Sequence, residues 1–293
     1  MINKGLSRLG IGFLYLVSLL PFWVLYLISD FLFVIVYYII GYRRKVVQEN
    51  LQNSFPEKTA EERRSIEKKY YQHLCDLVVE TVKMITISHK GVAKRLSSPN
   101  PEILYDYFAD KRSVIGALGH YGNWEVANLG LSFYLDITLL VVYKPLSNKL
   151  IDDFFIKVRS RFGSKLVAMK NTTRTMVKYK DECTFSALVA DQTPVKHEAF
   201  YFTNFLNQPT AFFLGIEKLA KLTGQVVVFC DVKRVKRGYY ETTFIPITEN
   251  PKETAEYEIT NAYIKCLETM IRREPQYWLW SHRRWKFKPE DKA

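Results

Sequence analysis

The chain lacks the cysteine patterns that mark zinc sites and disulfide frameworks. Its four cysteines are widely separated, and no two of them form a C-x-x-C pair. Scattered single cysteines are typical of buried thiols in a reducing compartment, so they favour the cytoplasm. The sequence also contains no zinc finger, RNP motif or basic leucine zipper, and no internal repeat or low-complexity segment. These absences argue against the common zinc-binding and nucleic-acid-binding classes.

Acidic residues are scarce relative to basic ones. The 293 residues include 42 Lys and Arg but only 30 Asp and Glu, which leaves a formal net charge of +12. Such a balance indicates a polyanionic partner, here nucleic acid, an anionic membrane surface or a phosphorylated substrate. Hydrophobic residues make up 48% of the chain, which is enough to bury a sizeable core. The aromatic content of 15% fits either a membrane interface or an ordinary aromatic core.

Charge is almost absent from the N-terminal segment. Residues 9–42 contain a single charged residue, Asp30, and about 20 apolar residues are enough to cross a bilayer. Pro21 interrupts the run, and Ser29 with Asp30 would cap a second helix over Phe31–Ile40. The segment is therefore either one long kinked helix or two helical pieces, the second in the membrane interface; a buried helical pair is the soluble alternative. No small-residue cleavage site follows it, so it is not a simple signal peptide.

Basic residues flank this segment on both sides. Lys4 and Arg8 precede it, and the consecutive basic residues Arg43–Lys45 follow it. Positive charge tends to stay on the cytoplasmic side, and the larger cluster favours a cytoplasmic body. We therefore predict a membrane anchor over residues 1–45 and a separate domain over residues 46–293.

Beyond the anchor, hydrophobic periodicity predicts an α/β fold. Residues 46–90 are helical, with a solvated charged face and an apolar core-facing stripe. From about residue 113, short apolar runs alternate with amphipathic stretches, which predicts a mixed sheet flanked by helices on both faces. The predicted strands are 113–119, 137–143, 165–169, 184–190, 225–232 and 240–246. The predicted helices between them are 123–133, 147–162, 172–180, 210–222 and 255–271.

The segment with the clearest chemistry follows the first of these strands. It is Val114–Glu125, with the sequence VIGALGHYGNWE. Ligands of α/β sheets bind beyond the carboxyl ends of strands, so His120 lies where chemistry is expected. With Asn123 as the N-cap, Glu125 falls in the first helical turn, where the positive helix end favours a carboxylate. A turn at Gly122 would let that carboxylate reach back to the imidazole.

A carboxylate bonded to one ring nitrogen of a histidine fixes the tautomer and leaves the other nitrogen as a base. We predict that His120 acts as this base and that Glu125 orients it. Such a base can deprotonate an alcohol as the alcohol attacks a thioester, which contributes about 10²–10⁴-fold. No nucleophilic serine or cysteine is then required. The alternative is a structural histidine at a strand end with a capping glutamate.

These residues resemble the H-x4-D/E motif of glycerolipid acyltransferases. The chain as a whole is more specifically similar to the late lipid A biosynthesis acyltransferases, the lauroyl and myristoyl transferase group. The similarity covers nearly the whole chain, starting with the apolar N-terminal segment. It continues, in order, through Arg44–Pro56 (RKVVQENLQNSFP), His120–Glu125 (HYGNWE), Arg159 with Arg161, Ala190–Gln192, Gln208–Thr210 and Tyr277–Lys286 (YWLWSHRRWK). H-x4-E alone is a weak signal, but the ordered set is specific.

The resemblance implies an acyltransferase of the bacterial inner membrane with its catalytic domain on the cytoplasmic face. The acyl donor would be acyl carrier protein or acyl-CoA, and the acceptor a hydroxyl of a lipid A precursor or related glycolipid. No metal, cofactor or nucleic acid is implied. His120 and Glu125 carry over as the catalytic dyad. Substrate-binding candidates carry over at Asn123, Arg159, Arg161, Asp191, Gln192 and Thr210. In this chain Gln192-Thr193-Pro194 lacks the second acidic residue that some members have there.

Several of these candidates also have simpler interpretations. Arg159 and Arg161 end an amphipathic helix, where they are either solvated or placed to bind a phosphate. The resemblance does not say which of the two is the important arginine. Asp191 repeats the strand-end placement of His120. Thr210 is either a helix cap or an anion contact.

Two further segments stay open on sequence alone. The basic cluster Lys233–Arg237 is either a grip for anionic headgroups or an acidic carrier protein, or a solvated hairpin turn. The run Tyr277–Lys286 interleaves tryptophans with cations, which suits a membrane interface as well as a core.

Two other functions are compatible with the same residues, and nucleic-acid binding is a third that rests on the net charge alone. One is the same chemistry on a different acceptor, such as an aminolipid, a phosphatidylinositol mannoside or a lysophospholipid. The other is a catalytically silent lipid-binding protein, which the presence of both His120 and Glu125 argues against.

Overall fold

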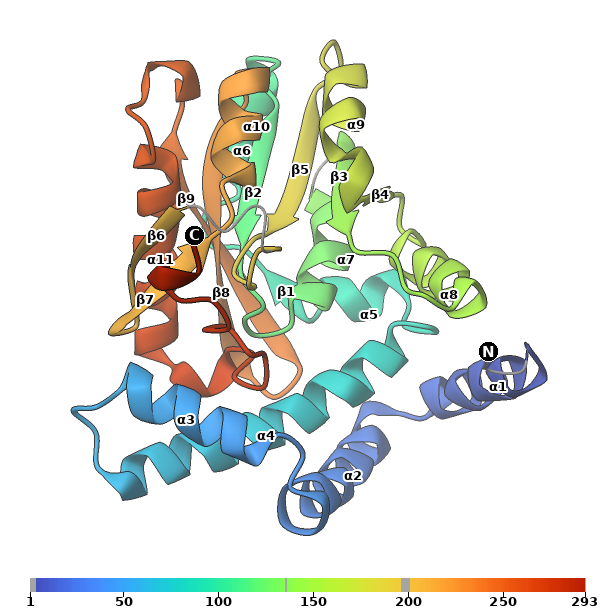
Figure 1. Cartoon of the computed structure of the whole chain (residues 1–293). Coiled ribbons are helices and arrows are strands. Elements are labelled where there is room, and N and C mark those ends of the chain that lie inside the picture. The colour runs from blue at the N-terminus through green and yellow to red at the C-terminus, as the bar shows by residue number, and fades with distance from the viewer. Residues whose placement is uncertain (1–3, 135, 196–200, 293) are drawn as a thin grey trace.

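Helices cover both faces of a mixed β-sheet in the computed structural model, which describes residues 4–134, 136–195 and 201–292 (Figure 1). Seven strands lie in the order β1-β9-β8-β2-β5-β3-β4, and neighbours run parallel except for β8 with β9. The predicted α/β fold with a mixed sheet is confirmed. The strands are β1 (Leu96–Ser97), β2 (Val114–Leu118), β3 (Thr138–Tyr143), β4 (Lys165–Ala168), β5 (Thr184–Val189), β8 (Val226–Lys236) and β9 (Tyr239–Thr248).

The helices agree with the sequence prediction at four of five positions beyond residue 113. The α-helices are α1 (Lys4–Leu19), α2 (Phe22–Phe33), α3 (Arg44–Ser54), α4 (Ala60–Lys83), α5 (His89–Ala93), α6 (Glu102–Ala109), α7 (Trp124–Tyr134), α8 (Lys149–Arg159), α9 (Thr172–Lys178), α10 (Gly215–Thr223) and α11 (Glu258–Arg273). A π-helix over Val34–Ile40 extends α2.

Strand β2 divides the core into two layers. Ile115 and Ala117 point into the larger apolar cluster, which includes α10 and α11, whereas Val114 and Leu118 point into the smaller cluster with α6. All four side chains are at most 1% exposed. Full burial of a valine, leucine or isoleucine side chain contributes roughly 1.5–3 kcal/mol. The centre of the sheet is therefore a rigid base for the loop that follows β2.

The predicted helix over 210–222 is wrong in its first half. Residues 208–212 form strand β7 (Gln208–Phe212), which pairs with β6 (Tyr201–Phe205), and helix α10 starts only at Gly215. The two strands are joined by Leu206 and Asn207, both with positive φ (50° and 63°), as a two-residue hairpin turn of the primed type requires. The pair lacks the glycine of the usual Asn-Gly and Asp-Gly turns, so the hairpin signal there was weak.

The break in the apolar N-terminal segment lies at Pro21, not at Asp30. Pro21 separates α1 from α2, because proline has no N–H to continue the helical ladder. Ser29 and Asp30 lie inside α2, and the Ser29 hydroxyl donates to Asp76 at 2.7 Å rather than capping a new helix. The division of the chain into an anchor and a domain at residue 45 stays a prediction. Helix α2 packs against α4, which belongs to the predicted domain.

Helix α4 runs past the edge of the sheet at which β2 ends, and α2 lies on the side of α4 away from the sheet (Figure 1). It begins at a capping box formed by Thr59 and Glu62. Its side chains His73 and Glu80 contact the loop after β2, at Gly122 and Asn123. The loop that follows β2 therefore lies between the sheet and helix α4.

Candidate active site

His120 lies in a tight turn between β2 and α7. Gly122 has a φ of 58°, and a Cβ atom there would lie 3.0 Å from a methyl group of Val232, so the position favours glycine. The Gly122 N–H donates to the Tyr277 carbonyl at 3.0 Å, and the Gly122 carbonyl lies 3.2 Å from Nε2 of His73. The turn is thus held from two sides.

The carboxylate that holds the imidazole is Asp191. Its Oδ1 lies 2.5 Å from Nδ1 of His120, and its Oδ2 accepts from the His120 backbone N–H and from Nε1–H of Trp278, both at 2.8 Å. Asp191 is 2% exposed, and its three donors meet the requirement that a buried charge be paired and hydrogen-bonded. The prediction that Glu125 orients the imidazole is therefore wrong, because Asp191 occupies that position.

The electrostatics of this pair define the state of the imidazole. Burial alone would lower the pKa of His120, but the Asp191 carboxylate, its hydrogen bond and the nearby Glu125 charge raise that pKa above its ordinary value of 6.5. Burial alone would raise the pKa of Asp191, but His120, Trp278 and the backbone N–H lower it below 3.8. Asp191 is therefore ionised, so neutral His120 carries its proton on Nδ1.

The other ring nitrogen of His120, Nε2, is the one that can accept a proton. With the proton on Nδ1, Nε2 is an acceptor, and the amide nitrogen of Gln192 lies 3.2 Å from it. Gln192 is exposed, and the His120 side chain is 20% exposed. A hydroxyl group that displaced the Gln192 amide would meet an unprotonated nitrogen in hydrogen-bonding reach.

Glu125 instead pairs with Arg159. The guanidinium donates to both carboxylate oxygens, through Nε at 2.8 Å and Nη2 at 2.5 Å. This bidentate geometry is specific to arginine. The two side chains are 12% and 28% exposed, so the pair borders solvent. The structure thus brings four predicted residues together as two hydrogen-bonded pairs on neighbouring elements: His120 with Asp191, and Glu125 with Arg159.

Similarity to known proteins shows which family the chain belongs to. The sequence family described as bacterial lipid A biosynthesis acyltransferase matches residues 1–287. The chain belongs to the bacterial lipid A biosynthesis acyltransferase family. It is therefore an acyltransferase, as the sequence resemblance predicted.

Named relatives of this lipid A acyltransferase share most of its length at low identity. The lipid A biosynthesis lauroyltransferase of Escherichia coli K12 is 28% identical over 290 residues, covering 97% of this chain and 92% of that protein. The lipid A biosynthesis acyltransferase of Haemophilus influenzae is 23% identical, covering 93% and 85%. The palmitoleoyltransferase of E. coli K12 is 24% identical, covering 97% and 92%.

Three of the predicted substrate contacts of this acyltransferase are engaged within the protein. Asn123 is fully buried: its Oδ1 accepts from the Val126 N–H and caps α7, and its Nδ2 donates to Glu80. Thr210 is 1% exposed in strand β7, where its hydroxyl accepts from Nε1–H of Trp285. The structure therefore does not support direct substrate contact at these two positions, nor a helix cap at Thr210.

The third is Arg161, which lies two residues after Arg159 but has different partners. Its guanidinium donates to the carbonyls of Met84, Ile85 and Ile87, which follow the C-terminal end of α4. Carbonyls at a helix C-terminus lack partners within the helix, and a cation there is favourable. Of the two arginines, only Arg159 lies at the candidate active site.

We expect Arg161→Met to lower stability and to spare catalysis. The substitution removes three charge-assisted hydrogen bonds from a partly exposed site, so the free energy of unfolding should fall by about 1–3 kcal/mol. Acyl transfer per folded molecule should remain near that of the unsubstituted enzyme. Urea unfolding and specific activity of the folded fraction measure the two effects. Loss of transfer at unchanged stability would instead assign Arg161 to the substrate.

Sequence analysis missed Glu80, a buried acid of α4. Its carboxylate is 3% exposed and accepts hydrogen bonds from Asn123 and Tyr240, both at 2.7 Å, and from Tyr26 at 3.0 Å. It therefore fixes the amide that caps α7 and so the start of the helix that carries Glu125. Burial raises the pKa of this carboxyl, against the effect of its hydrogen bonds. No local signal marked it, because charged residues commonly flank the apolar stripe of an amphipathic helix.

The C-terminal tryptophans belong to the core rather than to a membrane interface. Trp278 and Trp280 are 3% and 0% exposed. Asn50, from the segment Arg44–Pro56, donates to the carbonyls of Trp280 and His282 at 2.8 and 3.0 Å. The segments Arg44–Pro56 and Tyr277–Lys286, which both carried the family resemblance, therefore contact each other.

Half of the basic cluster Lys233–Arg237 is also used internally. Arg234 donates to Asp76 at 2.8 Å, and Arg237 donates to Asp76 and to Asp30 at 2.6 Å. Lys233 and Lys236 stay exposed at the β8–β9 hairpin. The cluster is therefore neither a fully solvated turn nor a set of four unpaired cations that could bind an anionic partner.

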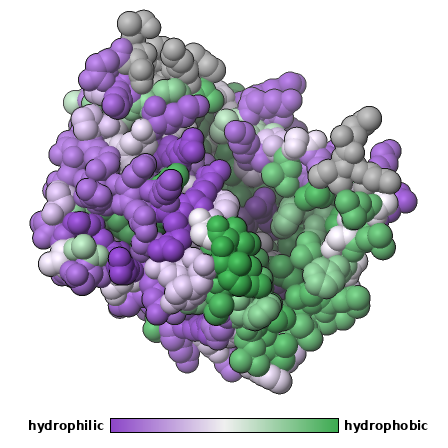
Figure 2. Space-filling model, turned by 60° about the horizontal axis from the view of Figure 1, so that its bottom comes forward, coloured by the Kyte–Doolittle hydropathy of each residue, from purple (hydrophilic) through white to green (hydrophobic). Residues whose placement is uncertain are grey.

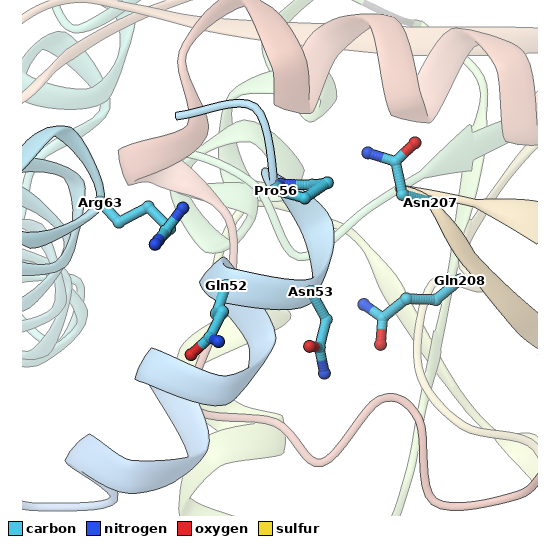
Figure 3. A pocket seen from close by; sticks show the side chains of 6 residues that line it. All are labelled: Gln52, Asn53, Pro56, Arg63, Asn207 and Gln208. Carbon is cyan, nitrogen blue, oxygen red and sulfur yellow. The ribbon is translucent and has the colours of Figure 1, made fainter. Parts of the chain in front are cut away.

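A polar cavity of about 430 Å³ lies between α3 and the β6–β7 turn (Figure 3). Its lining residues are Gln52, Asn53, Pro56, Arg63, Asn207 and Gln208. None of these is a predicted site residue, so the cavity is separate from the pairs around His120. Among residues 4–134, 136–195 and 201–292, no cluster of three or more His, Cys, Asp or Glu side chains is placed to hold a metal ion.

Proposed function

We propose that this enzyme transfers a fatty acyl chain from an acyl thioester to a hydroxyl of a lipid A precursor, with His120 as general base. The observation that supports the proposal most strongly is the state of His120. Asp191 fixes Nδ1–H at 2.5 Å, and Nε2 is left as a partly exposed acceptor at the carboxyl end of β2. The donor is acyl carrier protein or acyl-CoA.

The proposed reaction needs no covalent enzyme intermediate. Nε2 of His120 takes the proton of the acceptor hydroxyl while the hydroxyl oxygen bonds to the thioester carbonyl carbon. The tetrahedral intermediate then collapses, the carbon–sulfur bond breaks, and the imidazolium returns the proton to the leaving thiolate. Asp191 stabilises the imidazolium in between, because it is an anion hydrogen-bonded to Nδ1–H.

Glu125 acts in this proposal through Arg159. The carboxylate holds the guanidinium in one orientation, and the guanidinium supplies positive charge for the oxyanion of the tetrahedral intermediate. Preorganised charge of this kind needs no rearrangement at the moment of reaction. Gln192, whose amide already contacts Nε2, is the residue that the incoming hydroxyl displaces.

We expect Arg159→Lys to lower kcat by about 10²-fold, because a lysine cannot reproduce the bidentate contact with Glu125. Initial rates of acyl transfer measure the loss. Lys157→Ala is the matched control, since Lys157 is an exposed cation on the same helix and should have no effect. Equal rates for Arg159→Lys and the unsubstituted enzyme would remove Arg159 from the mechanism.

The proposed acceptor is a membrane lipid. We propose that the enzyme lies at the cytoplasmic face of the bacterial inner membrane and is held there by the apolar segment of residues 1–45. The helix over Phe22–Ile40 is long and apolar enough to cross a bilayer by length and composition.

The test of the proposed function is an assay with purified components. The enzyme in mixed micelles is supplied with a lipid A precursor and with acyl carrier protein or CoA thioesters, and mass spectrometry reads the acceptor. An added mass of one acyl chain on the lipid A precursor is expected. Transfer only to aminolipids or lysophospholipids would contradict the acceptor, and no transfer from either thioester would contradict the function.

A further inference from the structure

Helix α2 and its π-helical extension lie lengthwise on α4. Leu25, Ser29, Phe33 and Tyr37, each four residues apart, are buried in this contact. Side-chain contacts are spaced along both helices, in antiparallel order: Tyr26 with Glu80 (3.0 Å), Ser29 with Asp76 (2.7 Å), and the rings of Tyr37 and Tyr71 (5.3 Å between centroids). The helix is therefore docked on the protein body along its whole length.

This docking conflicts with a membrane-spanning role for α2. If α2 crossed a bilayer as it is packed here, α4 would have to lie in the hydrocarbon beside it. The part of α4 that lies along α2 carries the charged residues Asp76 and Glu80, and Asp76 in turn pairs with Arg234 and Arg237. Charged side chains are strongly disfavoured in hydrocarbon. The length and hydropathy of α2 would allow it to span a bilayer, but the charged side chains of α4 packed beside it would not.

The opposite face of the N-terminal helices is apolar and exposed. On α2 it contains Trp23, Leu27 and Phe31, each at least 60% exposed. On α1 the exposed residues Leu6, Leu9, Phe13 and Leu16 recur at helical spacing. Figure 2 shows a broad hydrophobic area gathered on one part of this face of the molecule, beside a largely hydrophilic remainder. Single exposed apolar residues are ordinary, whereas a contiguous face marks a binding surface.

Cations border this apolar face at both of its ends. Lys4 and Arg8 are exposed on α1, and Arg43 and Lys45 are exposed just beyond the π-helix. Exposed cations that flank an apolar helical face are complementary to an anionic leaflet. In a single span the two cationic ends would lie on opposite sides of the membrane. In an in-plane arrangement both lie on the same, cytoplasmic side.

We infer that α1 and α2 attach the enzyme in the plane of one anionic leaflet, without crossing the bilayer. The exposed faces of both helices enter the leaflet, and the docked face of α2 stays on α4. Because α4 also contacts the loop that carries His120, this attachment sets the candidate active site beside the headgroup region. The inference rests on the proposed membrane attachment and not on the proposed chemistry.

Depth measurements on α2 distinguish the two arrangements. Nitroxide labels are placed singly at Trp23, Leu27, Phe31 and Val34 through cysteine substitutions in the full chain. The protein is bound to vesicles of phosphatidylethanolamine and phosphatidylglycerol, and oxygen and nickel-chelate accessibility report depth. We expect similar, shallow depths at all four sites. For a perpendicular span, Trp23 and Phe31 would differ by about 12 Å along the membrane normal.

A depth that changes steadily along these sites would overturn the inference. Water-like accessibility at all four would overturn it as well, because no lipid would then cover this face. Protection of the labels without vesicles would do the same by assigning the face to a second copy of the chain. A catalytically inactive protein that gave the shallow pattern would contradict the proposed function while leaving this inference standing.

Topology in cells provides an independent measurement. Lys4→Cys is exposed to a membrane-impermeant maleimide in intact spheroplasts and again after permeabilisation, with the unsubstituted chain as background. We expect labelling only after permeabilisation. Lys45→Cys is the matched control, because it is cytoplasmic in both arrangements. Labelling of Lys4→Cys in intact spheroplasts would show that α2 crosses the membrane.

Discussion

Replacement of His120 by alanine should lower acyl transfer by about 10²–10⁴-fold, the usual contribution of a general base. The acceptor hydroxyl would then lose its proton only to water. The imidazole is 20% exposed, and without it Asp191 keeps two of its three donors, the His120 backbone N–H and the Trp278 ring, so the protein should stay folded. Initial rates with a saturating acyl thioester measure the loss, and thermal unfolding measures the stability.

The exposed histidine of α5 provides the control for this substitution. His89→Ala should leave the rate of transfer unchanged, because His89 lies on the surface at the start of a short helix. Transfer by His120→Ala within a few-fold of the unsubstituted enzyme would exclude His120 as the base. It would also favour the interpretation of His120 as a structural residue at a strand end.

Asp191→Asn should lower transfer by about 10³–10⁴-fold, although the asparagine has nearly the same shape. Two fixed N–H groups, from the His120 backbone and the Trp278 ring, point at Oδ2 of Asp191. The oxygen of an asparagine must therefore take that position, which turns its amide nitrogen toward Nδ1 of His120. The imidazole would respond by moving its proton to Nε2, the nitrogen that has to act as base.

The comparison variant for this prediction is Asp231→Asn. Asp231 also pairs with a cation, but both of its oxygens accept from Arg273 rather than from His120, and its side chain is 15% exposed. We expect it to change kcat by less than about threefold, the scale of a peripheral ion pair. Similar losses in the two variants would mean that removal of any carboxylate harms the enzyme, and would contradict a special role for Asp191.

The sequence contained enough information to place His120 and Asp191 but not to pair them. Both residues follow a predicted strand, and that placement is confirmed. Strands β2 and β5 are parallel neighbours with Leu118 opposite Val189, so two further residues along each chain bring His120 beside Asp191. Strand order is a property of the whole fold. Without it, the nearer acid in the sequence, Glu125, was the natural partner.

Other features depended on contacts that no local pattern encodes. Arg159 and Arg161 are two residues apart, yet one binds Glu125 and the other binds carbonyls beyond the end of α4. The hairpin of β6 and β7 relies on positive φ at Leu206 and Asn207, and these two residues donate hydrogen bonds to Glu268 and to the Ser54 carbonyl. Glu80 has its role because Asn123, Tyr240 and Tyr26 converge on it from three separate parts of the chain.

The most direct test of an Asp191-held base is the pH dependence of kcat/KM in the unsubstituted enzyme and in Asp191→Asn. Only neutral His120 can accept a proton, and the Asp191 charge raises its pKa above 6.5. In the unsubstituted enzyme kcat/KM should therefore fall as the pH drops through a value above 6.5. Without the charge, burial lowers the pKa, so the residual activity of Asp191→Asn should persist to lower pH. An unchanged acid limb, or one shifted to higher pH, would contradict the account.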